Sequence, residues 1–171
     1  MSLSTKLEVN LAATLISALD LTTATAPISK TWTPLDLTSG TAVNQADTIF
    51  SDTRTLAASA TENINLYTQT DAVGTTFTNA RVKLLCIYNR NTTAGDILRV
   101  GGLAASTTWT APFNTSNTAT VDVAPGGVLV LAAPSAAGFT VTNTTNHLLK
   151  FANVSASNSL AYDLVVIGAS A

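Results

Sequence analysis

The chain has 171 residues and a formal net charge of −2, with 46% hydrophobic but only 11% charged residues. This length predicts one domain over residues 1–171 with a sizeable core, and the apolar content is too high for a disordered chain. Eight Lys and Arg residues are too few for a nucleic-acid-binding surface, one Cys excludes a disulfide framework within the chain, and no apolar run reaches the roughly 18 residues of a membrane span.

Four small residue types dominate the composition, because Thr, Ser, Ala and Asn make up 84 of the 171 residues. Thr is β-branched and favours strands, whereas Asn and Ser favour turns. Ala favours helices, but the sequence has no sustained apolar stripe of helical period. The composition therefore predicts a mostly β chain with a neutral surface, much of which we expect neighbouring subunits to cover.

The first predicted strand lies at the N-terminus, where Leu7, Val9 and Leu11 alternate with polar residues as in a half-buried strand. The stretch 12–21 is ambiguous, and its Thr and Ser residues favour a strand or irregular structure over a helix. We expect residues 1–7 to form a short arm that could add a strand to a neighbour's open sheet edge. These residues lack the pattern of a secretory signal peptide, so we expect synthesis in the cytoplasm.

The next segments are predicted to be extended chain separated by turns. Pro27 and Pro34 bracket an extended edge segment, and Ser39-Gly40 predicts a turn. Residues 62–67 alternate again and place Ile64 and Leu66 on one face.

The clearest buried element is the apolar run 82–88, which predicts a central strand covered on both faces. A turn at 89–95 follows, and we expect 96–100 to return as its hairpin partner, closing at Gly101-Gly102. Cys86 lies inside the apolar run, so we expect a free thiol that acts as a small buried hydrophobe.

The C-terminal third predicts five further strands. Pro125-Gly126-Gly127 has the residues of a type II turn, and we expect a hairpin between 120–123 and 128–131 around it. Three more apolar segments complete the set, at 139–142, 147–154 and 160–167.

Eight to ten short strands with turn signals at regular spacing predict an all-β chain. The expected architecture is a single antiparallel β-sandwich domain, jelly-roll-like, with the short N-terminal arm at about residues 1–7.

Residues that carry chemistry are sparse. His147 is the only histidine and has no spaced His or Cys partner, whereas a zinc site needs three or four ligands. A Ser-His-Asp arrangement remains open because its members need not be near in sequence, although no Gly-x-Ser-x-Gly turn occurs. The glycine pairs are followed by neither Gly-Lys-Ser nor a helix, which argues against a phosphate-binding loop.

Asp47, Asp52 and Asp71 are the acidic residues from which a glycosidase pair could be drawn, but all three have turn-like neighbours. A calcium site also lacks the usual Asp-x-Asp-x-Asp-Gly loop. We therefore name no catalytic, cofactor-binding or metal residue and expect no cofactor.

Two features leave a structural and a functional interpretation open. Asp52 and Arg54 share one face of a strand, so they form either a surface ion pair or a buried or intersubunit one. Trp32 and Trp109 lie in Thr-rich stretches, where they either anchor an interface or a glycan or fill the end of the core.

Several short segments occur in a characteristic order between residues 7 and 168. They are Ala18-Leu19-Asp20-Leu21, Asn44-Gln45-Ala46-Asp47, Asp52-Thr53-Arg54-Thr55-Leu56, Ala80-Arg81-Val82-Lys83, Val100-Gly101-Gly102, Pro125-Gly126-Gly127 and Ala161-Tyr162-Asp163-Leu164-Val165-Val166-Ile167-Gly168. In this order they resemble a family of small virion structural proteins of tailed bacteriophages. The resemblance implies a non-enzymatic decoration or cement protein on the capsid surface of the virion, with no catalytic residues to carry over.

The same resemblance implies two partners, which are further copies of the chain, in a homo-oligomer expected to be a trimer, and the major capsid protein. The alternative is a head-fibre, spike or neck component that binds a receptor or glycan. An exposed aromatic cluster containing Trp32 or Trp109 would favour that alternative. A carbohydrate-active enzyme on the same fold would need converging carboxylates or a metal site.

Overall fold

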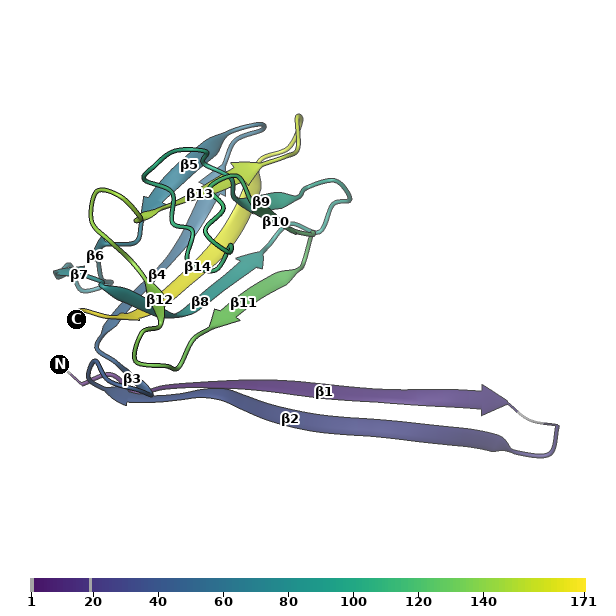
Figure 1. Ribbon diagram of the computed structural model, residues 1–171. Helices are drawn as coiled ribbons and strands as arrows, with labels where there is room; N and C mark the ends of the chain where they lie inside the picture. Colours follow the sequence, from purple (N-terminus) through teal and green to yellow (C-terminus); the bar gives the residue numbers. More distant parts are fainter. Residues whose placement is uncertain (1, 19) are drawn as a thin grey trace.

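The computed structural model describes residues 2–18 and 20–171, and it consists of a two-sheet body and one long projecting hairpin (Figure 1). Every regular element in the described residues is a strand. The prediction of an all-β antiparallel sandwich is confirmed.

The body contains two sheets, named here sheet I and sheet II. Sheet I has the order β11-β8-β14-β4, with β12 pairing beside β8, and sheet II has the order β10-β9-β13-β5. Sheet I comprises β4 (Thr48–Leu56), β8 (Arg81–Asn89), β11 (Val128–Ala132), β12 (Phe139–Thr140) and β14 (Leu160–Ala169). Sheet II comprises β5 (Thr61–Asn65), β9 (Leu98–Gly101), β10 (Thr120–Val123) and β13 (Leu148–Asn153).

Successive strands of the body mostly alternate between the sheets. In chain order β4, β8, β11 and β14 belong to sheet I and β5, β9, β10 and β13 to sheet II, and all pairings within both sheets are antiparallel. Apart from the short strand β12, each sheet has four strands, and two four-stranded sheets connected in this way form a jelly roll. The short strands β6 (Thr68–Thr70) and β7 (Thr76–Thr78) pair with each other outside the two sheets.

The main core lies between the two sheets, and aromatic residues fill much of it. The rings of Phe151 and Tyr162 stack with their centroids 4.8 Å apart. Trp109 is fully buried and meets Phe139 edge-on at 6.0 Å, while its indole Nε1 donates to the carbonyl oxygen of Thr140. Trp109 therefore fills the core, as one of its two interpretations expected.

The hairpin comprises β1 (Thr5–Ala18) and β2 (Thr23–Ser39) and is called the arm below. Its base is anchored by a small second core in which Leu35 and Leu37 pack with Leu84 and Ile167 of sheet I. The last residues of β2 also pair in parallel with β3 (Gln45–Ala46).

The arm differs from the one expected at residues 1–7. Residues 5–7 pair with β2 of the same chain, and the projecting element continues from them to Ser39. The stretch 12–18 is strand, while Leu19 lies outside the described residues. Val9 and Leu11, expected to be half-buried, are exposed because no second layer covers them in the part of the chain that the structure describes.

Two predicted hairpins are wrong. Residues 98–101 pair with β10 and β13 in sheet II and not with β8. The type II turn does form, with Gly126 at φ 69° and Gly127 N donating to Ala124 O at 2.8 Å, but it connects β10 of sheet II to β11 of sheet I. An alternating pattern indicates which side chains of a strand face the core. It does not indicate which of the two sheets the strand joins, because strands on either side of one core show the same pattern.

Candidate functional site

The two faces of the arm differ in chemistry beyond its base. A register shift lies between Leu7 and Val9, and beyond it the strands pair regularly to the tip. Directly opposed residues lie on the same face of a sheet, as do residues two apart on one strand. One face carries the pairs Val9–Trp32, Leu11–Lys30, Ala13–Ile28 and Leu15–Ala26, and the other carries Asn10–Thr31, Ala12–Ser29, Thr14–Pro27 and Ile16–Thr25.

The first of these faces, called the apolar arm face, is open to solvent. Leu15 is 72% exposed, Ile28 56% and Trp32 50%. An isolated two-stranded hairpin is marginally stable in water, because it has no layer against which to bury its side chains. The arm therefore has the composition of one half of an interface.

The outer face of sheet I is also apolar. Its register aligns Val128, Tyr88 and Asp163 in one row, and Val130, Cys86 and Val165 in the next. The following row, Ala132, Leu84 and Ile167, is the one that the base of the arm covers. Tyr88, Val128 and Val130 remain exposed, and with Cys86 and Val165 they form a surface called the outer patch below.

The outer face of sheet II has a different character. Arg99 and Asp122 lie opposite each other there and form a bidentate pair, with N–O distances of 2.7 and 2.8 Å. Lys150 and Asn63 are opposed on the same sheet. Of the two sheets, sheet I therefore has the more apolar outer face, and the base of the arm packs on this face.

Asp52 and Arg54 do share a face of β4, and their side chains lie 2.7 Å apart in a partly exposed ion pair. Arg54 also binds Glu62 of sheet II at 2.6 Å, and Glu62 accepts a hydrogen bond from the Tyr162 hydroxyl at 2.8 Å. The bond to Glu62 raises the pKa of the Arg54 guanidinium, and burial raises the pKa of the Tyr162 hydroxyl.

The role of Glu62 was missed at the sequence level. The signal was present, because Glu62 lies two residues before Ile64 and four before Leu66, on the face that these residues bury. An acidic residue on a buried face requires a partner, and Arg54 supplies it.

Of the three aspartates from which a glycosidase pair could be drawn, two line one pocket and the third lies apart. Asp47 accepts hydrogen bonds from the backbone and hydroxyl of Ser170, and Asp71 accepts from the backbone N–H groups of Val73 and Thr75. Asp47 and Asp71 line one pocket of about 160 Å³, whereas Asp52 lines two other depressions together with its neighbours in β4 residues 51–55. Each carboxylate already has a local structural partner.

His147 is half-buried, and its backbone N–H donates to Thr107 O at 3.1 Å. No group of three or more His, Cys, Asp or Glu side chains suited to hold a metal ion occurs in residues 2–18 and 20–171. Cys86 is a free thiol, as expected, but it lies on the outer face of sheet I and not in the main core. The apolar run 82–88 hid this position, because both faces of β8 carry apolar side chains.

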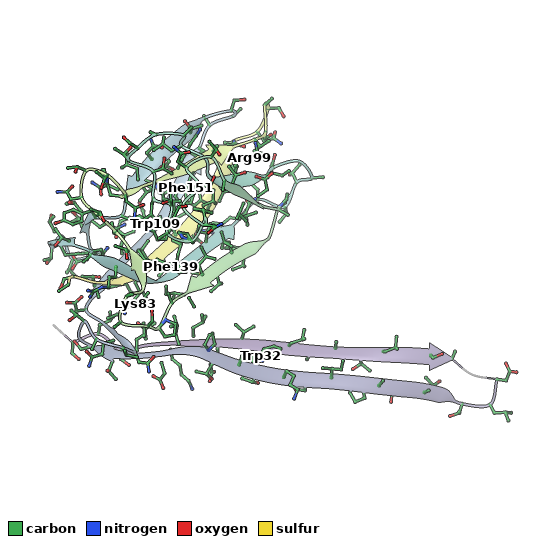
Figure 2. The ribbon with its side chains drawn as sticks, viewed as in Figure 1. Trp32, Lys83, Arg99, Trp109, Phe139 and Phe151 are labelled. Carbon is green, nitrogen blue, oxygen red and sulfur yellow. The ribbon has the colours of Figure 1, made fainter. Side chains whose placement is uncertain are left out.

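Trp32 and Trp109 lie far apart in the fold. Figure 2 shows Trp32 on the arm, whereas Trp109 lies in the body with Phe139 and Phe151. They therefore form no common aromatic cluster.

None of the elements in the described part of the chain is a helix long and apolar enough to cross a membrane. Comparisons with protein-family models, with curated proteins and with solved structures find no match.

Proposed function

We propose that the protein is a non-enzymatic structural protein of a tailed-phage virion, a decoration or cement protein that binds the major capsid lattice as an oligomer. The observation that carries this proposal is the arm, a long hairpin whose apolar face has no covering layer among residues 2–18 and 20–171. A surface of this kind suits a protein that works in an assembly.

Two further features support the proposal. The jelly-roll body is an architecture used by viral capsid domains, although many unrelated proteins share it. A repeated shell also needs only a modest contact energy per copy, because many linked contacts act together. Small Thr, Ser and Ala side chains suit such contacts, since they lose little conformational entropy when they are buried.

Purified particles provide the test. Quantitative mass spectrometry should find this chain in a fixed ratio to the major capsid protein, set by the symmetry of the capsid. Particles that lack the chain should release their DNA at a lower temperature than complete particles. Finding only a few copies per particle would contradict a decoration role.

The second candidate is a fibre, spike or neck component that binds a receptor or glycan, and half-exposed Trp32 is the observation that favours it. Trp32 is isolated from Trp109, which is buried, so the aromatic cluster expected to support this function does not form around these two residues. Binding of purified protein to a glycan array that is lost in Trp32→Ala would favour this candidate over the first.

A further inference from the structure

We propose that the apolar arm face of one copy of this chain docks on the outer patch of a second copy. The proposal goes beyond the capsid function, because it assigns a contact between copies that forms in solution without the capsid. Both surfaces belong to this chain, both are apolar, and both lack a covering layer among the described residues.

The apolar arm face is continuous with a contact that the chain already makes. Leu7, Leu35 and Leu37 at the base of the arm belong to the small core on the outer face of sheet I, together with Leu84 and Ile167. Val9 and Leu11 continue the alternation of Leu7 along β1, so the apolar arm face extends this packed surface. The outer patch continues the covered row of sheet I in the same manner. The docking therefore repeats, between copies, the packing seen within one copy.

The arm also reaches beyond the body of its own chain. In Figure 1 the arm leaves the body beside β3 and runs well past the end of β11, so that its distal half has no part of the body next to it. Leu15 and Ile28 in this distal half are both more than half exposed. The distal half therefore needs a layer from outside the chain.

Charge placement agrees with the same arrangement. Lys30 is the one charged side chain among the eight residues that define the apolar arm face. The outer patch is bordered by Asp163, which lies in the row of Val128 and Tyr88 and pairs with Arg90 at 3.2 Å. An arm of a second copy can place Lys30 near Asp163, whereas two arms packed face to face would bring two Lys30 side chains to one apolar interface.

The native Cys86 lies within the outer patch and permits a direct test by disulfide cross-linking. Leu11→Cys places a thiol on the apolar arm face, and Ala12→Cys places one on the opposite face as the matched control. On oxidation of purified protein, Leu11→Cys should give a covalent dimer or larger species on a non-reducing gel. The Ala12→Cys variant and the double variant Leu11→Cys/Cys86→Ser should remain at the monomer mass.

Mixing two forms of the chain shows whether the disulfide joins the arm of one copy to the outer patch of another. Leu11→Cys/Cys86→Ser refolded together with the unmodified chain carries the arm thiol and the patch thiol on different copies, so a covalent heterodimer should form. Cross-linking of Leu11→Cys/Cys86→Ser with itself would show contact between arms and overturn the proposal. A disulfide that forms only within one chain, or no disulfide at all, would overturn it as well.

Sedimentation gives an independent measurement that needs no cysteine. Leu11→Lys/Leu15→Lys and Ala12→Lys/Ile16→Lys add the same two charges to adjacent positions on opposite faces, and Leu15 and Ile16 are similarly exposed, at 72% and 64%. The first variant should sediment as a monomer, and the second should keep the oligomeric mass of the unmodified chain. A monomeric unmodified chain, or equal masses for the two variants, would overturn the proposal and leave the particle-based test of the capsid function unaffected.

Discussion

The hydroxyl of Tyr162 donates a hydrogen bond of 2.8 Å to Oε1 of Glu62, and this bond joins the two sheets across the main core. Tyr162 belongs to β14 of sheet I and stacks on Phe151, whereas Glu62 belongs to β5 of sheet II. The other carboxylate oxygen of Glu62 binds Arg54 of sheet I. A charged acceptor makes such a bond stronger than a neutral one, so we expect this link to contribute measurably to stability.

Replacing Tyr162 by Phe removes the hydroxyl and keeps the stacked ring. We expect the free energy of unfolding to fall by about 1–2 kcal/mol, because Glu62 keeps Arg54 but loses its buried donor. Urea denaturation followed by circular dichroism measures the change. The matched control is Tyr88→Phe, at an exposed position on sheet I, which should change stability by less than about 0.5 kcal/mol. Equal effects of the two variants would refute the interpretation of the link.

The same residue predicts a dependence on alkaline pH. Burial, aided by Glu62, raises the pKa of Tyr162 in the folded chain, whereas the unfolded chain ionises this residue near pH 10. Above pH 10 the unfolded state therefore binds fewer protons than the folded state, and stability falls as the pH rises. The stability difference between the unmodified chain and Tyr162→Phe should shrink between pH 9 and pH 11. A difference that stays constant over this range would contradict the prediction.

Several elements could be predicted from the sequence because local pattern and final environment agree. The alternation at Ile64 and Leu66 and the apolar run of β8 correspond to strands of the body. Pro125-Gly126 forms the expected turn because only a residue tolerant of positive φ fits its second central position.

The remaining features depend on information that the pattern does not contain. Residues 98–101 show which side chains face the core but not which sheet they join. Val9 and Leu11 alternate with polar residues just as strands of the body do, because an amphipathic strand looks the same whether its own chain or another one covers it. The projecting arm could therefore be found only from the three-dimensional fold.

Alanine substitutions at two glycines distinguish the free-energy cost of a positive φ from the free-energy cost of steric crowding. Gly126 has φ 69°, and no described atom lies within 4 Å of the position that a Cβ would take, so Gly126→Ala should cost only about 1–2 kcal/mol. Gly101 has φ 97°, and a Cβ there would lie 2.5 Å from the carbonyl oxygen of Ala119. Gly101→Ala should therefore lower the melting temperature clearly more than Gly126→Ala. Similar melting temperatures for the two variants would show that the backbone at Ala119 moves away from the new methyl group at no cost in free energy.

Lys83 connects sheet I to the loops beside the base of the arm. Its side chain is buried, and its ammonium group donates to the carbonyl oxygens of Ser135, Ala136 at 3.1 Å and Ala42 at 3.5 Å. Figure 2 places Lys83 at the arm side of the body. Burial lowers the pKa of this amine, and the nearby charge of Arg81 lowers it further.

We expect Lys83→Met to keep the volume of the side chain and to remove all three donations. Amide hydrogen exchange should then become faster around residues 42–45 and 133–138, because these loops lose their common donor. Exchange in β5 and β13 should not change. Lys150→Met on β13 serves as the control, since Lys150 lies in sheet II and away from these loops. Unchanged exchange in both loops would show that the backbone bond from Asn44 to Pro134 holds them without Lys83.

Shortening the arm tests whether the body folds without it. Replacing residues 9–33 by Asn-Gly places Glu8 opposite Pro34, in register with the Leu7–Leu35 pair, closes the base with a two-residue hairpin turn and removes the whole apolar arm face. The main core contains no residue of the arm, so we expect the shortened chain to unfold cooperatively with a free energy within about 1 kcal/mol of the full-length monomer. Leu35→Ala in the full-length chain should instead cost about 2–4 kcal/mol, because Leu35 is buried against sheet I. If the shortened chain fails to fold while Leu35→Ala has little effect, then the distal arm, and not its base, stabilises the body.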